Sequence, residues 1–193
     1  MTVKSVEAEW YYLDNGFSCR SGMKSQHRPI IEQAREQLDG VNGYVIDLGC
    51  GNAALLAKIC EERPGLVPWG CDVCSEALAH ARMLLPEFAG NFLLSDMFDP
   101  QLWTSGRHYA LTILMAGRLK DAHVMAAEAL LSNVARQSSR VLLYLSREWR
   151  DESLEKLAHS FNLRLHDVVD GLCGIVVPKS LELWASHAPQ FRK

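Results

Sequence analysis

The stretch that decides the fold reads Tyr44-Val45-Ile46-Asp47-Leu48-Gly49-Cys50-Gly51-Asn52-Ala53-Ala54. Its first half is a short β-branched and apolar run, which is typical of a buried strand. A turn rich in glycine follows, and a helical pattern from Ala53 to Arg63 ends at Pro64 and Gly65. The stretch therefore predicts a strand, a tight turn and a helix. Its glycines fit the pattern G-x-G-x-x-A, which a dinucleotide-binding turn would also satisfy, so the glycines alone do not decide the ligand.

The same alternation continues along the chain. Further strands are expected at 66–71, 91–94, 109–114 and 141–145, and helices at 75–85, 122–135 and 152–161. Two last strands, 163–169 and 174–177, are separated by Asp170-Gly171, a tight-turn dipeptide that suits antiparallel neighbours. This order predicts an α/β fold with a doubly wound, mostly parallel, seven-stranded Rossmann-like sheet and an antiparallel last strand. Its ligand should lie beyond the carboxyl ends of the strands, where the strand order reverses.

A helix is also expected before this core, at residues 25–39. Ser25 fits its N-cap, Pro29 fits its first turn, and Gly40 ends it. We therefore divide the 193-residue chain into three parts: a short helical N-terminal extension or lid with the first helix (1–39), a core (40–177) and a C-terminal tail (178–193). Apolar side chains of the tail would cover a sheet edge or form a homodimer contact.

Composition and charge narrow the class of protein. The chain has 20 Lys and Arg against 23 Asp and Glu, a net charge of −3, which argues against binding nucleic acid mainly through bulk charge. Composition leaves a local basic patch open. No continuous apolar run approaches the length of a bilayer span, so we expect a cytoplasmic protein without membrane contact. The motif Cys71-x-x-Cys74 lacks the further ligands that a zinc site needs, so we expect free thiols and no metal.

Asp47 indicates which class of ligand the glycine turn binds. It stands two residues before Gly49, where a dinucleotide would place its anionic pyrophosphate, and like charges repel. A ligand with a positive ammonium and a positive sulfonium would be attracted instead. At this point the sequence resembles the class I S-adenosylmethionine-dependent methyltransferases, whose first motif is an acid followed by G-x-G, as Asp47, Gly49 and Gly51 stand here. The resemblance implies that the glycines let the backbone approach the cofactor, that the acid orients its amino-acid end, and that Asn52 lies at the same site.

Two further acids fall where this resemblance needs them. Asp72 ends the second expected strand and matches the family's acid that accepts the ribose hydroxyls, with Val73 beside it. An acid at this position is also found in proteins that bind NAD. Asp96 follows the third expected strand and matches the position that accepts from the adenine amino group, with Met97 supplying a backbone contact. Acids at the ends of three successive strands are a more specific sign of this family than the glycine loop alone.

The loop after the fourth expected strand completes the resemblance. In the family this loop runs beside the methionine part of the cofactor, so Met115 and Ala116 are expected to line it. The chain departs from the family pattern in two places: Ala53 stands at the usual third-glycine position, and no Asn-Pro-Pro-Tyr type motif follows the fourth strand. The second departure argues against methylation of nucleic-acid base amino groups and leaves the acceptor open.

An aromatic segment, Glu9–Phe17, precedes the core. In the family such segments often fold over the cofactor, and Tyr11 or Tyr12 would then offer a ring to the sulfonium. His27 and Arg28 stand near the start of the next helix. Arg28 suits the cofactor's carboxylate, and Tyr12 and His27 are the candidate catalytic residues, because either could take a proton from the acceptor.

The sequence thus predicts an enzyme that moves the methyl group of S-adenosylmethionine to an oxygen or nitrogen of a small molecule or short peptide, for example in natural-product biosynthesis. Such an in-line displacement mainly requires that acceptor and methyl group be aligned. Three alternatives stay open. They are an NAD-dependent oxidoreductase of related fold, an RNA methyltransferase with a local basic surface, and a protein that binds S-adenosylmethionine without turnover.

Overall fold

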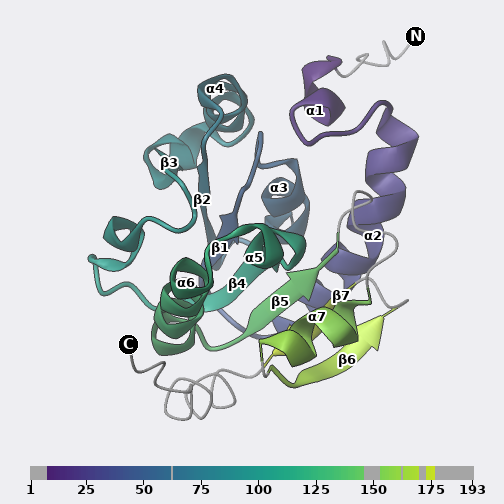
Figure 1. Ribbon diagram of the computed structural model, residues 1–193. Coiled ribbons are helices and arrows are strands. Elements are labelled where there is room, and N and C mark those ends of the chain that lie inside the picture. The colour runs from purple at the N-terminus through teal and green to yellow at the C-terminus, as the bar shows by residue number, and fades with distance from the viewer. Residues whose placement is uncertain (1–7, 62, 146–152, 162, 170–172, 177–193) are drawn as a thin grey trace, which may run out of the picture.

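The computed structural model describes residues 8–61, 63–145, 153–161, 163–169 and 173–176. It shows a seven-stranded sheet in the order β3-β2-β1-β4-β5-β7-β6 (Figure 1). The strands are β1 (Gly43–Leu48), β2 (Leu66–Asp72), β3 (Phe92–Leu94), β4 (Tyr109–Met115), β5 (Val141–Tyr144), β6 (Leu165–Val169) and β7 (Cys173–Val176). The pairs among β1 to β5 are parallel, and β7 lies antiparallel between β5 and β6. The predicted α/β fold is therefore confirmed. The turn Asp170-Gly171 and the tail 178–193 lie outside the described residues.

Helices cover both faces of the sheet, as Figure 1 shows. Neighbouring residues of β1 enter opposite cores, Val45 on one face and Ile46 on the other, because side chains alternate along a strand. Burial on both faces explains why these strands read as continuous apolar runs. The core that contains Val45 lies under α2 (Arg20–Gln37), α3 (Ala54–Cys60) and α4 (Ser75–Leu84), and the other lies under α5 (Gly117–Asp121), α6 (Val124–Gln137) and α7 (Leu154–Ser160).

The register of the central strands brings their ends to one edge. Leu48, the last residue of β1, lies opposite Cys71 of β2 and Leu114 of β4. The strand order reverses here, because the chain moves from β1 outward to β2 and β3 and then returns to β4 on the other side of β1. The loops after these strands therefore meet at the switch point, where open α/β sheets bind their ligands.

The first long helix starts earlier than the sequence predicts. Helix α2 begins at Arg20 with Cys19 as its N-cap, so Ser25 is not the cap, and Pro29 lies in the interior rather than in the first turn. Proline has no N–H to donate inside a helix, a local cost that tertiary packing overrides here. Met23 supplies that packing, because it is buried with residues of α1 (Trp10–Leu13) and α3. The sequence pattern around residues 20–25 does not reveal this tertiary contact, so it could not predict the early start of α2.

Candidate functional site

A cavity of about 550 Å³ lies at the carboxyl ends of β1 to β4, beside the segment that precedes α2. It is the switch-point site that the fold predicts. Its wall contains nine of the residues singled out in the sequence, namely His27, Asp47, Gly49, Gly51, Asp72, Val73, Asp96, Met97 and Met115. The structure thus gathers the three strand-end acids and the glycine turn around one space.

Asp47 is the unusual group in this wall. Its side chain is only 2% exposed, and its Oδ1 has no hydrogen-bond partner among the described residues. Burial, and to a smaller extent the nearby negative charge of Asp72, together raise the pKa of Asp47 from 3.8 to about 7. A buried carboxylate without a partner is costly, and a cation placed beside it would remove that cost. The site is therefore suited to a positively charged group next to β1.

Asp72 fixes the glycine turn against the end of β2. The Gly51 N–H donates to Asp72 Oδ2 at 2.8 Å, and the Cys74 N–H donates to Oδ1 at 2.9 Å. The N–H groups of Gly49 and Cys50 both donate to the Cys71 carbonyl oxygen at 2.9 Å. Each carboxylate oxygen has a second lone pair, so Asp72 keeps the capacity to accept from a diol in the cavity.

Asp96 is an exposed acid that is also held by its own loop. The Phe98 N–H donates to Asp96 Oδ1 at 3.0 Å, and this turn presents Asp96 and Met97 to the cavity. Such a side-chain turn fixes the carboxylate and leaves its other oxygen open to a ligand.

The glycine turn needs left-handed backbone at three positions. Gly49 has φ +86°, Gly51 has φ +53° and Ala53 has φ 61°. Ala53, at the usual third-glycine position, therefore bears the strain that glycine avoids, which costs about 1–2 kcal/mol. The two glycines differ in their surroundings. A Cβ at Gly49 would meet no atom within 4 Å, whereas a Cβ at Gly51 would lie 2.6 Å from Asn15 Oδ1 and 3.0 Å from the Asp14 carbonyl oxygen.

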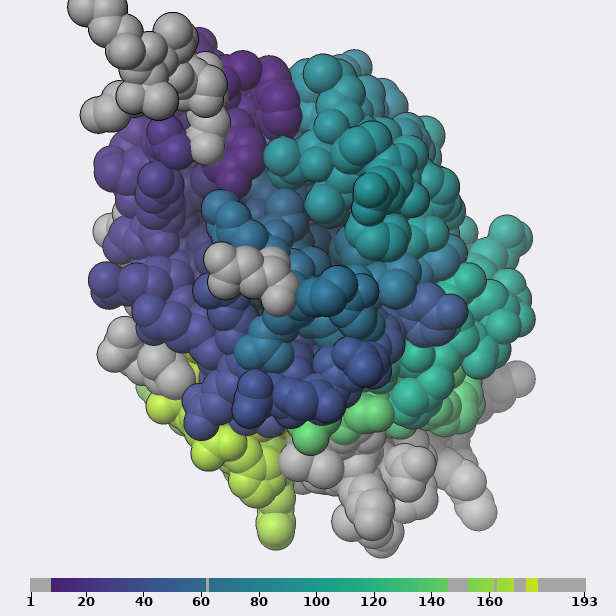
Figure 2. All heavy atoms as spheres, turned by 180° about the vertical axis from the view of Figure 1, so that it is seen from behind, coloured from purple at the N-terminus to yellow at the C-terminus, as the bar shows by residue number. Residues whose placement is uncertain are grey.

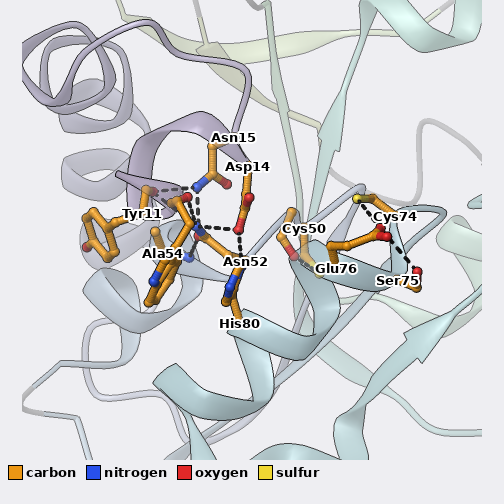
Figure 3. A network of polar contacts seen from close by, with 12 residues as sticks. Tyr11, Asp14, Asn15, Cys50, Asn52, Ala54, Cys74, Ser75, Glu76 and His80 are labelled. Carbon is orange, nitrogen blue, oxygen red and sulfur yellow. Dashed lines mark hydrogen bonds and ion pairs between the residues drawn. The ribbon is translucent and has the colours of Figure 1, made fainter. Parts of the chain in front are cut away.

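Asn52 holds the N-terminal segment to this turn (Figure 3). It is fully buried, and its Nδ2 donates to the carbonyl oxygens of Trp10 at 3.0 Å and Tyr11 at 3.1 Å. Its Oδ1 accepts from Asn15 Nδ2 at 2.7 Å. Asn52 does not line the cavity, so the structure places it beneath the segment rather than at the expected cofactor contact.

A second contact fastens the same segment to α4. His80 Nδ1 lies 2.7 Å from Asp14 Oδ2, and the Trp10 ring stacks on the His80 ring with centroids 4.3 Å apart and planes at 10°. Figure 3 shows Asp14 and Asn15 pointing down from the segment toward the turn and α4. Residues 14–17 then form part of the cavity wall. We call the residues that hold the segment the N-terminal latch: Trp10, Asp14, Asn15, Asn52 and His80.

Three other predicted site residues do not line this cavity. Tyr12 packs against the small buried cluster between α1, α2 and α3. Arg28 lines a second cavity, between α2 and α3. Ala116 is 1% exposed, and its N–H donates to the Tyr144 carbonyl oxygen at 2.8 Å. Arg28 lies on the side of α2 that faces α3, a placement that depends on how α2 packs on the core and that residue spacing does not determine.

His27 does reach the cavity, beside Phe17, whose ring meets the imidazole edge-on at 5.4 Å between centroids. Burial lowers the pKa of His27 from 6.5 to about 4. The imidazole is therefore neutral near pH 7, with a ring nitrogen able to accept a hydrogen bond.

The cavity wall also contains residues that the sequence did not single out, among them Arg118 of α5 and Tyr144 of β5. Burial and, after it, the negative charge of Asp47 raise the pKa of Tyr144, whereas the positive charge of Arg118 lowers it. Asp47 and Arg118 are therefore both close enough to Tyr144 to influence its hydroxyl group. Among the described residues of the wall, Arg118 is the only Lys or Arg. The wall also holds four carboxylates, namely Asp14, Asp47, Asp72 and Asp96. The positions of Arg118 and Tyr144 in the sequence could have indicated both residues, because Arg118 follows the end of β4 and Tyr144 is the last residue of β5.

The described residues contain no group of three or more His, Cys, Asp or Glu side chains placed to hold a metal ion. In the same part of the chain, no helix has the length and apolar character needed to cross a membrane.

Solved structures share this fold, although no protein-family model and no curated protein matches the chain. Monomeric WbdD superimposes with a TM-score of 0.61 at 18% identity, covering 86% of this chain and 44% of WbdD. An O-methyltransferase family protein from Burkholderia thailandensis gives 0.56 at 15% identity, covering 78% of this chain and 55% of that protein. The magnesium protoporphyrin IX methyltransferase of Synechocystis PCC 6803, solved with bound S-adenosylmethionine, gives 0.56 at 16% identity, covering 88% of this chain and 83% of that enzyme.

These likenesses show that the chain has the class I methyltransferase fold. The chain spans about half the length, 44% and 55%, of the first two proteins. At this level of identity they establish the architecture, and the activity has to be argued from the site.

Replacing Asp47 with Asn should stabilise the protein in a pH-dependent way. The folded pKa of Asp47, about 7, lies above its ordinary 3.8, so the buried ionised form destabilises the fold above pH 7 and this penalty disappears as the pH falls toward 4. Three pKa units correspond to about 4 kcal/mol, an upper limit for the gain of Asp47→Asn at pH 8. We expect urea unfolding to show a gain at pH 8 and almost none at pH 4. Glu87, an exposed acid that is in none of the ion pairs of the described residues, provides the control: Glu87→Gln should show no such difference. An Asp47→Asn gain independent of pH would contradict the assignment.

The two glycines of the turn provide a matched pair of variants. Gly49→Ala and Gly51→Ala should each lose about 1–2 kcal/mol of stability, because both positions are left-handed. Only Gly51→Ala pushes on Asp14 and Asn15. Amide hydrogen exchange at residues 10–17 should therefore accelerate in Gly51→Ala and stay near the parent rate in Gly49→Ala. Equal acceleration in both variants would show that the turn does not position the segment.

Proposed function

We propose that this protein is an S-adenosylmethionine-dependent methyltransferase that transfers the methyl group to an oxygen or nitrogen of a small molecule or short peptide. The observation that carries the proposal is the buried carboxylate of Asp47, one oxygen of which has no hydrogen-bond partner in the described part of the chain, in an acid-lined cavity at the switch point. S-Adenosylmethionine has an ammonium and a sulfonium, and both are cations that such a wall attracts. The shared fold supports this assignment.

The three strand-end acids would divide the cofactor between them, as the resemblance implies. Asp47 would bind the ammonium group, Asp72 would accept from the ribose hydroxyls, and Asp96 would accept from the adenine amino group. Gly49 has open space where a side chain would begin, which leaves the backbone free for close approach. The bound cofactor supplies a methyl group already activated by its sulfonium.

The cofactor's carboxylate also needs a partner, and we assign it to Arg118. Arg28, the residue favoured by the sequence, lines a different cavity. Arg118 stands in the same wall as Asp47, and both act on the pKa of Tyr144. An acid and a guanidinium placed together in this way complement the ammonium and carboxylate of an amino acid.

The acceptor would lie against the aromatic and apolar part of the wall, which contains the paired rings of Phe17 and His27 and the neighbouring strand residues Met115 and Tyr144. Apolar and aromatic side chains there exclude water and restrict the acceptor to a productive orientation. The neutral imidazole of His27 can accept a hydrogen bond from a hydroxyl or amine. Its pKa of about 4 makes it a weak proton acceptor, so its main role would be alignment.

The same charges weigh against a nicotinamide cofactor. A pyrophosphate beside Asp47 would face a buried carboxylate, and Asp72 already raises the pKa of that group. One arginine, 51% exposed, would have to offset four acids. Repulsion of this kind is a strong determinant of specificity.

A titration with S-adenosylhomocysteine and a decarboxylated analogue tests both the cofactor and Arg118. We expect the parent to bind S-adenosylhomocysteine and not NAD⁺. Arg118→Met should bind S-adenosylhomocysteine about tenfold more weakly, or about 1.4 kcal/mol, a value near the lower end for hydrogen bonds to charged groups. Both proteins should bind the decarboxylated analogue equally, because it lacks the group that Arg118 recognises.

Lys120→Met is the matched control, because it removes a charge from the same helix outside the cavity wall. It should bind both compounds as the parent does. If Arg118→Met weakens both compounds to the same extent, Arg118 does not recognise the carboxylate. If the parent binds NAD⁺ and no S-adenosylhomocysteine, the methyltransferase proposal fails.

A further inference from the structure

A second cavity, of about 400 Å³, lies in the groove between α2 and α3. Figure 2 shows the face of the molecule on which the violet surface of α2 runs beside the blue surface of α3. The floor of the groove is mostly apolar and is formed by Tyr11, Met23, Ile31 and Ala54. Charged side chains of the two helices surround this floor.

The rim of the groove is mainly basic. Among the described residues that line the groove, the cations are Arg20, Lys24, Arg28 and Arg35 from α2 and Lys58 from α3, and the acids are Glu32 and Glu61. Glu61 forms ion pairs with two of these cations: its carboxylate lies 3.1 Å from Lys58 Nζ and 3.8 Å from an Arg35 nitrogen. Lys24 and Arg28, farther along α2, have no carboxylate within ion-pair distance in the part of the chain that the structure describes.

This arrangement costs the helix stability. Lys24 and Arg28 stand four residues apart on this helix, and like charges at this spacing repel each other. The concentration of cations also contrasts with the net charge of −3 of the whole chain. A concave, partly apolar surface strengthens the field of such charges. A small anion between Lys24 and Arg28 would relieve the repulsion and gain charge-assisted hydrogen bonds.

The groove and the first cavity share one wall residue, His27. On the first side His27 meets Phe17, in the part of the cavity wall that we assign to the acceptor. On the other side it is one position from Arg28. A ligand held in the groove would therefore lie beside that part of the first cavity.

We propose that the groove between α2 and α3 binds a small phosphate-type anion, with Lys24 and Arg28 as its partners. The anion is either a phosphate group carried by the acceptor or free phosphate. The first source rests on the proposed function, whereas anion binding itself does not. The size of the groove favours a small molecule over a nucleic acid, which needs an extended basic surface.

The primary test is a titration of the ¹⁵N-labelled protein with inorganic pyrophosphate, followed by NMR at constant ionic strength. We expect saturable shifts of amides that line the groove. The double variant Lys24→Met/Arg28→Met should weaken pyrophosphate binding at least tenfold. The control Arg136→Met/Lys156→Met removes the same two charges from α6 and α7, on the opposite face of the sheet, and should bind as the parent does.

Non-saturable shifts in the parent, or equal weakening in both double variants, would overturn the proposal, because bulk charge would then explain the effect. A twelve-nucleotide single-stranded RNA is the third probe. If RNA binds the parent with a steep salt dependence, and the groove variant loses that binding while pyrophosphate binding is unaffected, the groove is a nucleic-acid surface and the small-anion proposal is wrong.

Phenyl phosphate and inorganic phosphate distinguish the two sources on protein saturated with S-adenosylhomocysteine. If the acceptor carries the anion, phenyl phosphate should bind at least tenfold more tightly than phosphate and should also shift the amides of Phe17 and Met115. Equal affinities, with shifts confined to the groove, would identify free phosphate as the ligand. Failure of S-adenosylhomocysteine to bind, with pyrophosphate binding intact, would remove the proposed function and leave the anion site standing.

Discussion

The rest of the site depends on the burial of one carboxylate at the end of the central strand. Asp47 is placed there by the register of β1 with β2 and β4, which makes the ends of three strands coincide. Among the described residues, its neighbour Asp72 does not neutralise it but adds a second negative charge, and Asp72 itself is held by the N–H of Gly51 in the glycine turn and the N–H of Cys74 after β2. Above neutral pH the protein thus retains an electrostatic cost that a bound cation would remove, and the glycine turn and the cavity lie directly beside this carboxylate.

Most of the fold could be predicted because its signals are local. Apolar runs bounded by glycine and proline marked the strands within a few residues, and their alternation with helical patterns determined the doubly wound order. The start of α2 could not be predicted, because burial of Met23 between α1 and α3 stabilises the turns before Ser25. The N-terminal extension was expected to be helical, but the bounds of α1 within it were not predicted, and the short helix α5 was not predicted, since helices of this length depend on tertiary contacts.

In the candidate site, too, the features with local sequence signals could be predicted, and those that depend on tertiary packing could not. The acids at the ends of β1, β2 and β3 were predicted correctly as neighbours, because parallel strands in this order must end together. Arg28 was expected at the cofactor, but it faces the groove beside α3. Asn52 was expected to contact the ligand, and its side chain instead binds the backbone of the N-terminal segment. The positions of the Arg28 and Asn52 side chains depend on how the N-terminal segment and α2 pack on the core. The spacing of residues in the sequence does not determine that packing.

The most direct test of the account is a measurement of the protons released when S-adenosylhomocysteine binds at pH 6.5. Calorimetric titrations in two buffers of different ionisation enthalpy give this number. With a pKa of about 7, Asp47 is mostly protonated at this pH, and a bound ammonium group would drive it to ionise. We expect the release of more than about half a proton per site. Binding with no proton release, or with proton uptake, would contradict it.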